Sequence, residues 1–100
     1  MARLTLDEVR DIGTAAIRRV LGDTFTTVEV ALDLDSEGRA AYRFTIRFPT
    51  EESWRRASAR QATINGAIID ALHSHDDERF PFIRILSDGG WSFEHSVAAE

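Results

Sequence analysis

The sequence predicts an α+β fold: a two-layer sandwich in which two helices pack on one face of an antiparallel sheet, in the order α-β-β-α-β-β. Residues 6–21 and 51–73 repeat apolar residues with helical spacing. Residues 27–48 and 80–94 instead alternate apolar and polar residues on either side of a turn, which is typical of hairpins. Amphipathic helices and a sheet with one apolar face bury those faces against each other, so a single two-layer arrangement follows.

The first helix is expected from about Leu6 to Leu21. Thr5 and Glu8 have the spacing of a capping box, and Gly22 is a typical helix stop. Its apolar residues share one stripe, and the glycine among them permits close packing on the sheet: Leu6, Val9, Gly13, Ala16, Ile17 and Val20.

The first hairpin, about residues 27–48, turns at Asp35-Ser36-Glu37-Gly38. A loop of Ser36 to Gly38 pairs Leu32 with Tyr42 and brings the apolar residues of both strands to one face. Gly38 is then expected in the left-handed conformation that closes such a loop.

The second helix, about residues 51–73, follows Pro49, with Thr50 as its cap and two acidic residues in its first turn. The pair Asn65-Gly66 favours turns, so the helix is expected either to kink at residues 65–66 or to split in two there, and the kink is the favoured alternative.

A second hairpin is predicted over residues 80–94, with a loop at Asp88-Gly89-Gly90. The tail, residues 96–100, is expected to be frayed.

Composition is consistent with one domain over residues 1–100, since 43% of the residues are hydrophobic and no linker interrupts the pattern. The sequence has no membrane-length apolar run and no signal-peptide core, so we expect a cytoplasmic protein without membrane contact. Cysteine and lysine are both absent, because all 12 basic residues are arginine. This excludes a thiolate nucleophile, a Schiff-base lysine and a P-loop lysine.

With helices on one sheet face, the other face is expected to be open. It would carry two apolar residues, Phe82 and Leu86, among Arg43, Arg47 and Arg84. An exposed apolar patch ringed by charge often marks a partner surface or a homodimer surface. A tail that folds back over this face, or a different assignment of the sheet faces, explains the two residues equally well. The first hypothesis is therefore a small non-enzymatic interaction or accessory domain that binds a protein partner or a second copy through this face or a strand edge. We identify no catalytic residue and expect no cofactor.

The densest chemical cluster is His73-Ser74-His75-Asp76-Asp77-Glu78. Its H-x-H-x-D spacing resembles that of metallo-hydrolases, and His73, His75 and Asp77, with Asp76 beside them, are the candidate ligands of a divalent metal. The same residues also suit a helix C-terminus followed by an exposed acidic loop. A metal-dependent enzyme site is the second alternative function.

The order helix-strand-strand-helix-strand over Leu6 to Leu86 resembles the type II KH arrangement, including ribosome-assembly factors in which a kink replaces the usual loop. Asn65-Gly66 would lie near that kink. The resemblance implies RNA binding, for which Arg55, Arg56 and Arg60 are the available basic residues. The sequence has no G-x-x-G between helices and a net charge of −5, which opposes contact with phosphates. RNA binding is therefore the first alternative function.

Overall fold

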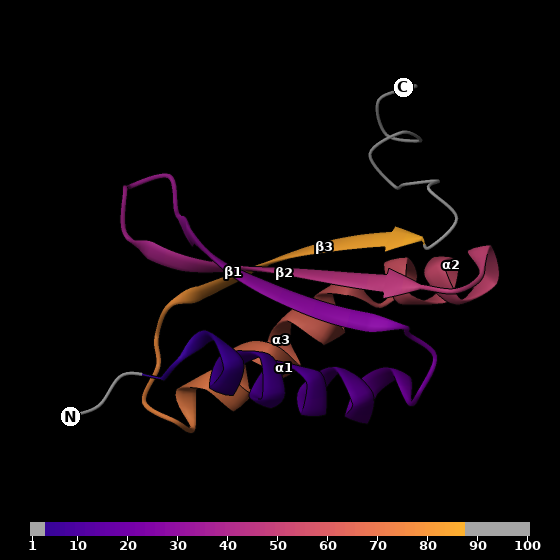
Figure 1. Ribbon diagram of the computed structural model, residues 1–100, viewed down its shortest axis with the longest axis horizontal. Helices are drawn as coiled ribbons and strands as arrows, with labels where there is room; N and C mark the ends of the chain where they lie inside the picture. Colours follow the sequence, from indigo (N-terminus) through magenta and orange to yellow (C-terminus); the bar gives the residue numbers. More distant parts are fainter. Residues whose placement is uncertain (1–3, 88–100) are drawn as a thin grey trace.

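The structure, a computed structural model, describes residues 4–87. The described chain has α+β architecture, with three helices and three strands (Figure 1). In chain order these elements are α1 (Leu6–Leu21), β1 (Thr27–Leu34), β2 (Ala40–Phe48), α2 (Glu51–Ala59), α3 (Gln61–His73) and β3 (Phe80–Ser87).

The first helix begins and ends where its capping signals predict. The Thr5 side chain accepts a hydrogen bond from the Glu8 N–H at 3.1 Å, and the Thr5 N–H donates to the Glu8 carboxylate at 2.8 Å. The Gly22 N–H closes the helix on the Arg18 carbonyl oxygen at 2.8 Å. The predicted apolar stripe faces the core through its buried members Val9, Gly13, Ala16 and Ile17.

The first hairpin has the predicted register. Leu32 lies opposite Tyr42, and the Asp35 N–H donates to the Arg39 carbonyl oxygen at 2.9 Å. Gly38 has a φ of 79°, the left-handed conformation that a loop of this length requires.

The prediction of an antiparallel sheet is wrong for β3. The sheet is mixed, with strand order β1-β2-β3, in which β1 is antiparallel and β3 parallel to β2. Parallel neighbours need a long crossover connection, and α2 with α3 supplies it by carrying the chain back to the start of β2. The second strand of the predicted 80–94 hairpin, its loop and the tail 96–100 lie outside the described residues.

The second predicted helix, residues 51–73, is two helices in the structure, α2 and α3. The helical stretch breaks at Arg60, whose φ of −114° and ψ of 22° are not helical, whereas Asn65 and Gly66 lie inside the continuous helix α3. The Arg60 guanidinium donates to the Val20 carbonyl oxygen at 2.9 Å, so a contact with α1 holds the break. Asn65-Gly66 stays helical because Ile64 and Ile68 on either side are fully buried.

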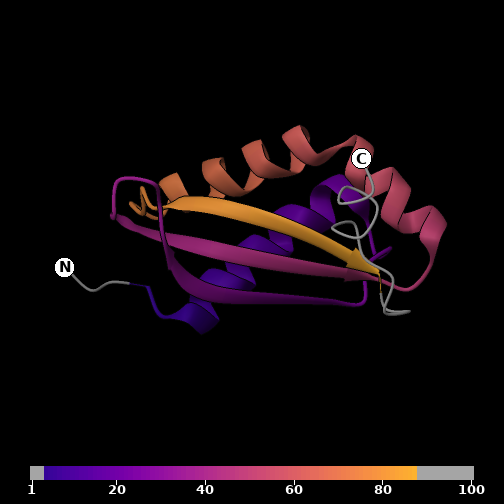
Figure 2. The same cartoon turned by 90° about the horizontal axis from the view of Figure 1, so that it is seen from above.

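The core lies between the helices and one face of the sheet. Seen from above, α1 crosses beneath the sheet obliquely, while α2 and α3 follow β3 (Figure 2). Four side chains of β2 point into this core and are fully buried, namely Tyr42, Phe44, Ile46 and Phe48. The opposite sheet face carries no helix of the described chain (Figure 1).

Candidate interaction surface

The open side of the sheet, here called the outer face, carries the five residues that the sequence predicts to contact a partner. Strand pairing places Arg43 beside Phe82 and Arg47 beside Leu86, with Arg84 beside Thr45. The remaining outer-face residues come from the same alternation in the three strands and are Thr27, Glu29, Ala31, Asp33, Ala41 and Phe80. The predicted residues therefore share one surface, although β3 reaches it in a direction that the sequence did not indicate.

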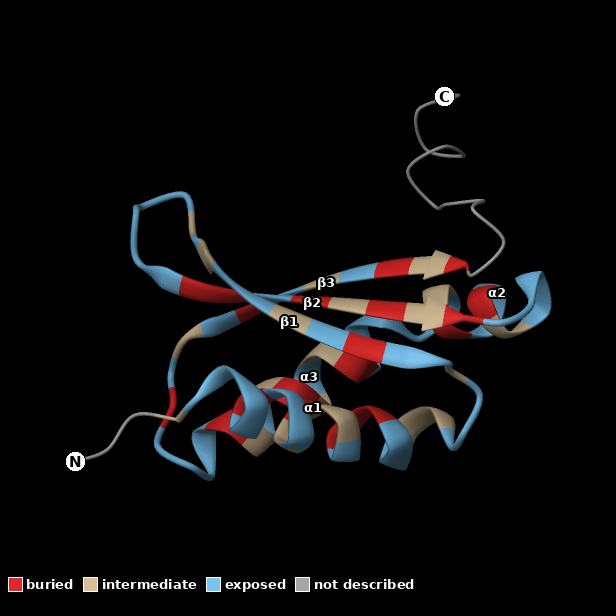
Figure 3. Ribbon diagram, viewed as in Figure 1, coloured by how far each residue is buried: buried red, intermediate tan, exposed pale blue. Residues whose placement is uncertain are grey.

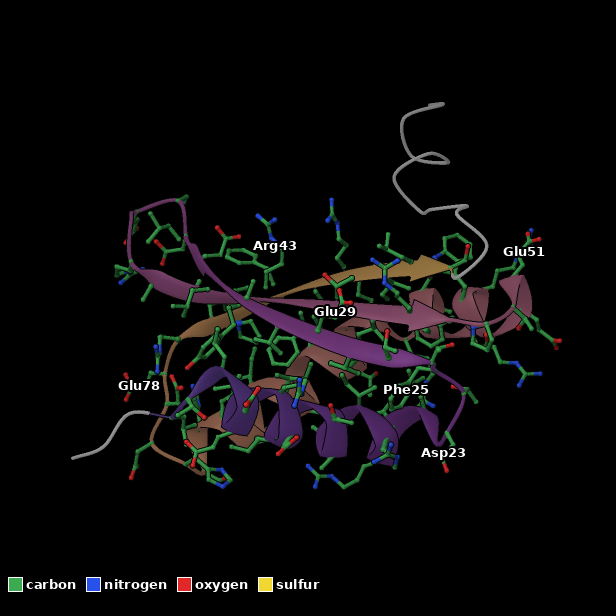
Figure 4. All side chains as sticks on the ribbon, viewed as in Figure 1. Asp23, Phe25, Glu29, Arg43, Glu51 and Glu78 are labelled. Atoms are coloured by element: carbon green, nitrogen blue, oxygen red, sulfur yellow. The ribbon has the colours of Figure 1, made fainter. Side chains whose placement is uncertain are left out.

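Two arginines of the outer face, Arg43 and Arg47, are paired with carboxylates of β1. Arg43 lies 2.7 Å from Asp33 Oδ2, and Arg47 lies 3.9 Å from Glu29 Oε1. Figure 4 shows Arg43 rising from the side of the sheet that faces away from α1. The backbone N–H of Leu34 and the guanidinium of Arg43 lower the pKa of Asp33. Such exposed ion pairs are typical of a solvated sheet surface and contribute little to stability. The exposed apolar residues are the less usual feature of this face.

Two phenylalanines of β3 form that apolar feature. Phe80 and Phe82 are 43% and 37% exposed, and their rings contact each other edge to face with centroids 5.0 Å apart. Leu86 lies further along the same strand and is half-buried. Phe80 was missed as a candidate, although its position two residues before Phe82 is a signal that the two share a face.

The edge of β3 that faces away from β2 is protected at one end. The buried Trp54 indole of α2 donates to the Ile85 carbonyl oxygen at 3.2 Å. Since successive residues of a strand point their backbone groups to opposite sides, Pro81 and Ile83 also point theirs away from β2. Pro81 has no N–H to expose there, which is the usual condition for proline in a strand.

A groove of about 450 Å³ runs between this edge and α3. We call it the β3 groove, and its lining has no charged side chain: Gln61, Ala62, Asn65, Phe80, Pro81, Phe82 and Ile83. Asn65 Oδ1 is buried and has no hydrogen-bond partner among the described residues. Phe80 and Phe82 thus belong both to the outer face and to the groove, at the border between the two.

A second hollow, of about 790 Å³, lies between the hairpin tip and the loop of residues 75–80. Its central polar contacts tie the loop to the core. The buried Asp77 accepts hydrogen bonds from the Tyr42 hydroxyl and from the Arg79 guanidinium, and Arg79 lies 4.7 Å from the centre of the Tyr42 ring. Burial opposes ionisation of Asp77, but the hydrogen bonds from Arg79 and Tyr42 outweigh it and lower the pKa of that carboxyl.

The predicted metal ligands do not converge. Asp77 is engaged by Tyr42 and Arg79, and His75 Nδ1 lies 3.0 Å from the Ala71 carbonyl oxygen. His73 is exposed in the last turn of α3. Within residues 4–87, no three histidine or carboxylate side chains are grouped so that they could hold a metal ion.

The basic residues proposed for RNA are engaged as well. Arg55 lies 2.6 Å from Glu51, Arg56 lies 2.9 Å from Glu52, and Arg60 donates to the Val20 carbonyl oxygen. Eight arginines of the described chain lie within ion-pair distance of a carboxylate: Arg10, Arg18, Arg39, Arg43, Arg47, Arg55, Arg56 and Arg79. Most of the positive charge of the described chain therefore has a carboxylate beside it.

Comparison with models of known protein families, with curated protein sequences and with solved structures gave no match. None of the helices α1, α2 and α3 combines the length and apolar content that crossing a lipid bilayer requires.

Proposed function

We propose that this chain is a non-enzymatic interaction domain that binds a protein partner where the outer face meets the β3 groove. The observation that carries the proposal is the exposed edge-to-face pair of Phe80 and Phe82 beside that groove. Aromatic residues are enriched at the centres of protein interfaces because they bury a large area at a low cost in side-chain entropy.

The surroundings of the pair support a protein partner. The groove offers apolar walls together with the backbone groups of Ile83, which point away from β2 at the edge of the sheet. A peptide can satisfy such donors and acceptors and place an apolar side chain against Phe82. The paired arginines, Arg43 and Arg47, lie around this centre as a polar rim of the kind that protein interfaces have.

Affinity capture tests the proposal. The tagged wild type, a Phe82→Asp variant and a Leu6→Asp variant are each incubated with nuclease-treated lysate of the source cells, and bound proteins are identified by mass spectrometry. Leu6 is the matched control, because its exposure of 38% is close to the 37% of Phe82 but it lies on α1. We expect a protein captured by the wild type and the control and lost with Phe82→Asp. Capture that Phe82→Asp leaves unchanged, while its circular dichroism shows an intact fold, would refute this surface.

RNA binding is the second candidate function. One observation favours it: the described chain has the helix-strand-strand-helix-strand order of the type II KH arrangement with its second helix broken, at Arg60. The ion pairs of Arg55 and Arg56 with Glu51 and Glu52 oppose it, since phosphate binding needs available cations. A parallel capture from untreated lysate tests this function, which predicts partners that are bound from the untreated lysate and lost from the nuclease-treated one.

A further inference from the structure

The other edge of the sheet belongs to β1. Because the Asp35 N–H bonds to Arg39 across the hairpin, the odd-numbered residues of β1 point their backbone groups toward β2. The even-numbered residues Val28, Val30, Leu32 and Leu34 therefore point their N–H and C=O groups away from the sheet.

This edge is less protected than the edge of β3. On β3, Pro81 has no N–H to offer, and the Trp54 indole occupies the Ile85 carbonyl oxygen. Helix α2 also packs beside β3. On β1 only the Leu34 N–H is occupied, by Asp33 Oδ1 at 2.8 Å. The outward groups of Val28, Val30 and Leu32 have no hydrogen-bond partner in the described part of the chain. An open edge of this kind is a ready template for pairing with another strand.

Apolar side chains accompany the open edge. Leu32 and Leu34 are 61% and 64% exposed, although they stand on the sheet face that the helices cover elsewhere. Figure 3 shows the hairpin end of β1 as a mostly exposed stretch, while Val28 at the other end is buried. Leu6 in the first turn of α1 is a further exposed apolar residue, and Figure 2 shows that this turn emerges on the β1 side of the sheet.

We propose that β1 pairs with β1 of a second copy of this chain, antiparallel and about a two-fold axis at Val30, so that the three described strands of each copy join into one continuous sheet. In this register the two Val30 residues exchange both of their backbone hydrogen bonds. Val28 of each copy exchanges bonds with Leu32 of the other. The outward donors and acceptors of Val28, Val30 and Leu32 are then all satisfied, while Leu34, whose N–H is already bonded to Asp33, lies at the end of the ladder.

The charges of the outer face favour this register over axes at the two neighbouring residues, Glu29 and Ala31. With Val30 at the axis, Glu29 lies opposite Ala31 and Asp33 lies opposite Thr27 of the second copy. An axis at Ala31 would set Glu29 against Asp33, and an axis at Glu29 would set two glutamates against each other. Like charges directly opposite each other destabilise strand pairing, so both of those registers are disfavoured.

The pairing also accounts for the exposed leucine. Leu32 of each copy comes beside Val28 of the other on the face toward the helices, where Val28 is already part of the core. The surface lies on the edge opposite to β3, so the inference is independent of the proposed function. One copy of the chain can bind a partner at Phe82 and a second copy at β1.

Sedimentation equilibrium over a concentration series tests the association. We expect a dimer in the wild type and at least a tenfold higher dissociation constant, about 1.4 kcal/mol, for Leu32→Lys, which places a charge at the pairing edge without removing a buried side chain. Phe80→Lys is the matched control, because it exchanges an exposed apolar residue for lysine on the other edge strand. A wild type that stays monomeric, or a dimer that Phe80→Lys weakens and Leu32→Lys does not, would overturn the proposal.

Single cysteines test the register, since the chain has no cysteine of its own. Val30→Cys should form a disulfide-linked dimer under mild oxidation, because paired Cα atoms at the axis are about 5.5 Å apart and disulfides span about 4.4–6.8 Å. The two positions 28 would be about 14 Å apart in this register, so Val28→Cys should remain uncrosslinked. The two positions 31 would be about 7–8 Å apart, on the diagonal. Faster crosslinking of Ala31→Cys than of Val30→Cys would refute the axis at Val30.

Discussion

At the scale of single residues, Gly13 shows how closely α1 approaches the sheet. A Cβ atom at this position would lie 2.8 Å from Phe44 Cζ and closer still to Phe44 Cε2, and the Phe44 side chain is fully buried. Gly13→Ala should therefore lower the free energy of unfolding by about 1–2 kcal/mol, since overpacking costs more than the gain in helix propensity. Urea denaturation measures this change.

Gly66 provides the matched control for Gly13. It lies inside α3, and a Cβ atom there would meet nothing within 4 Å. Gly66→Ala should raise the free energy of unfolding by about 0.5–1 kcal/mol, because alanine restricts the unfolded chain and favours the helix. Equal effects of the two substitutions would show that Gly13 is not in close contact with Phe44.

Asp77 couples stability to pH. Its carboxylate is buried, and the hydrogen bonds from Arg79 and Tyr42 lower its pKa below the ordinary value of 3.8. The stabilisation is complete above that ordinary value and is lost as the pH falls from it through the lower pKa of the folded state. Asp77→Asn should therefore lower the free energy of unfolding by about 2 kcal/mol near pH 7 and flatten its decline in acid.

Denaturation curves at about pH 7 and about pH 3 measure both expectations for Asp77. Asp11→Asn removes the same charge from an exposed residue of α1 and controls for the change in net charge. A variant Asp77→Asn whose stability falls in acid as steeply as that of the wild type would contradict this role.

At the scale of elements, α3 ends in an unusual way. Asp76 has a φ of 61°. Its N–H donates to the His73 carbonyl oxygen at 2.9 Å, and the Asp77 N–H donates to the Leu72 carbonyl oxygen at 3.0 Å. This is the Schellman arrangement, in which glycine normally takes the left-handed position. Asp76→Gly should therefore raise the free energy of unfolding by about 0.5–1 kcal/mol by relieving the steric cost of the side chain.

Thermal or urea denaturation of Asp76→Gly checks this expectation. Gly38→Ala is the converse control, because Gly38 has a φ of 79° and should lose about 1 kcal/mol when a Cβ is added. No gain from Asp76→Gly, together with the expected loss from Gly38→Ala, would show that the end of α3 carries no such strain.

Elements whose signals are local could be predicted from the sequence. The capping box of Thr5, the Gly38 turn and the alternation on both sides of it each specify structure within a few residues, and all three are confirmed. The break at Arg60 could not be predicted in this way. Its side chain bonds to Val20 on another helix, 40 residues away, and no local pattern at Arg60 indicates that contact.

At the scale of the whole molecule, charge distribution separates the two candidate functions. The net charge is −5, and the arginines proposed for RNA are paired with glutamates on α2. We expect fluorescence anisotropy to show no binding of labelled single-stranded RNA at physiological salt. Binding that weakens with added salt and is lost with Arg55→Gln and Arg56→Gln would contradict this expectation and favour the RNA function.

The sequence by itself determined the α+β class, the first hairpin with its register, the bounds of α1 and the alternation that places Phe82, Leu86, Arg43, Arg47 and Arg84 on outward positions. These properties depend on side-chain period, caps and turn residues, which act over a few positions. The direction of β3, the groove beside Phe80 and the capture of Asp77 by Tyr42 were decided only in the tertiary structure. They depend on how the α2–α3 crossover returns the chain to β2, and that path is set by core packing between distant segments.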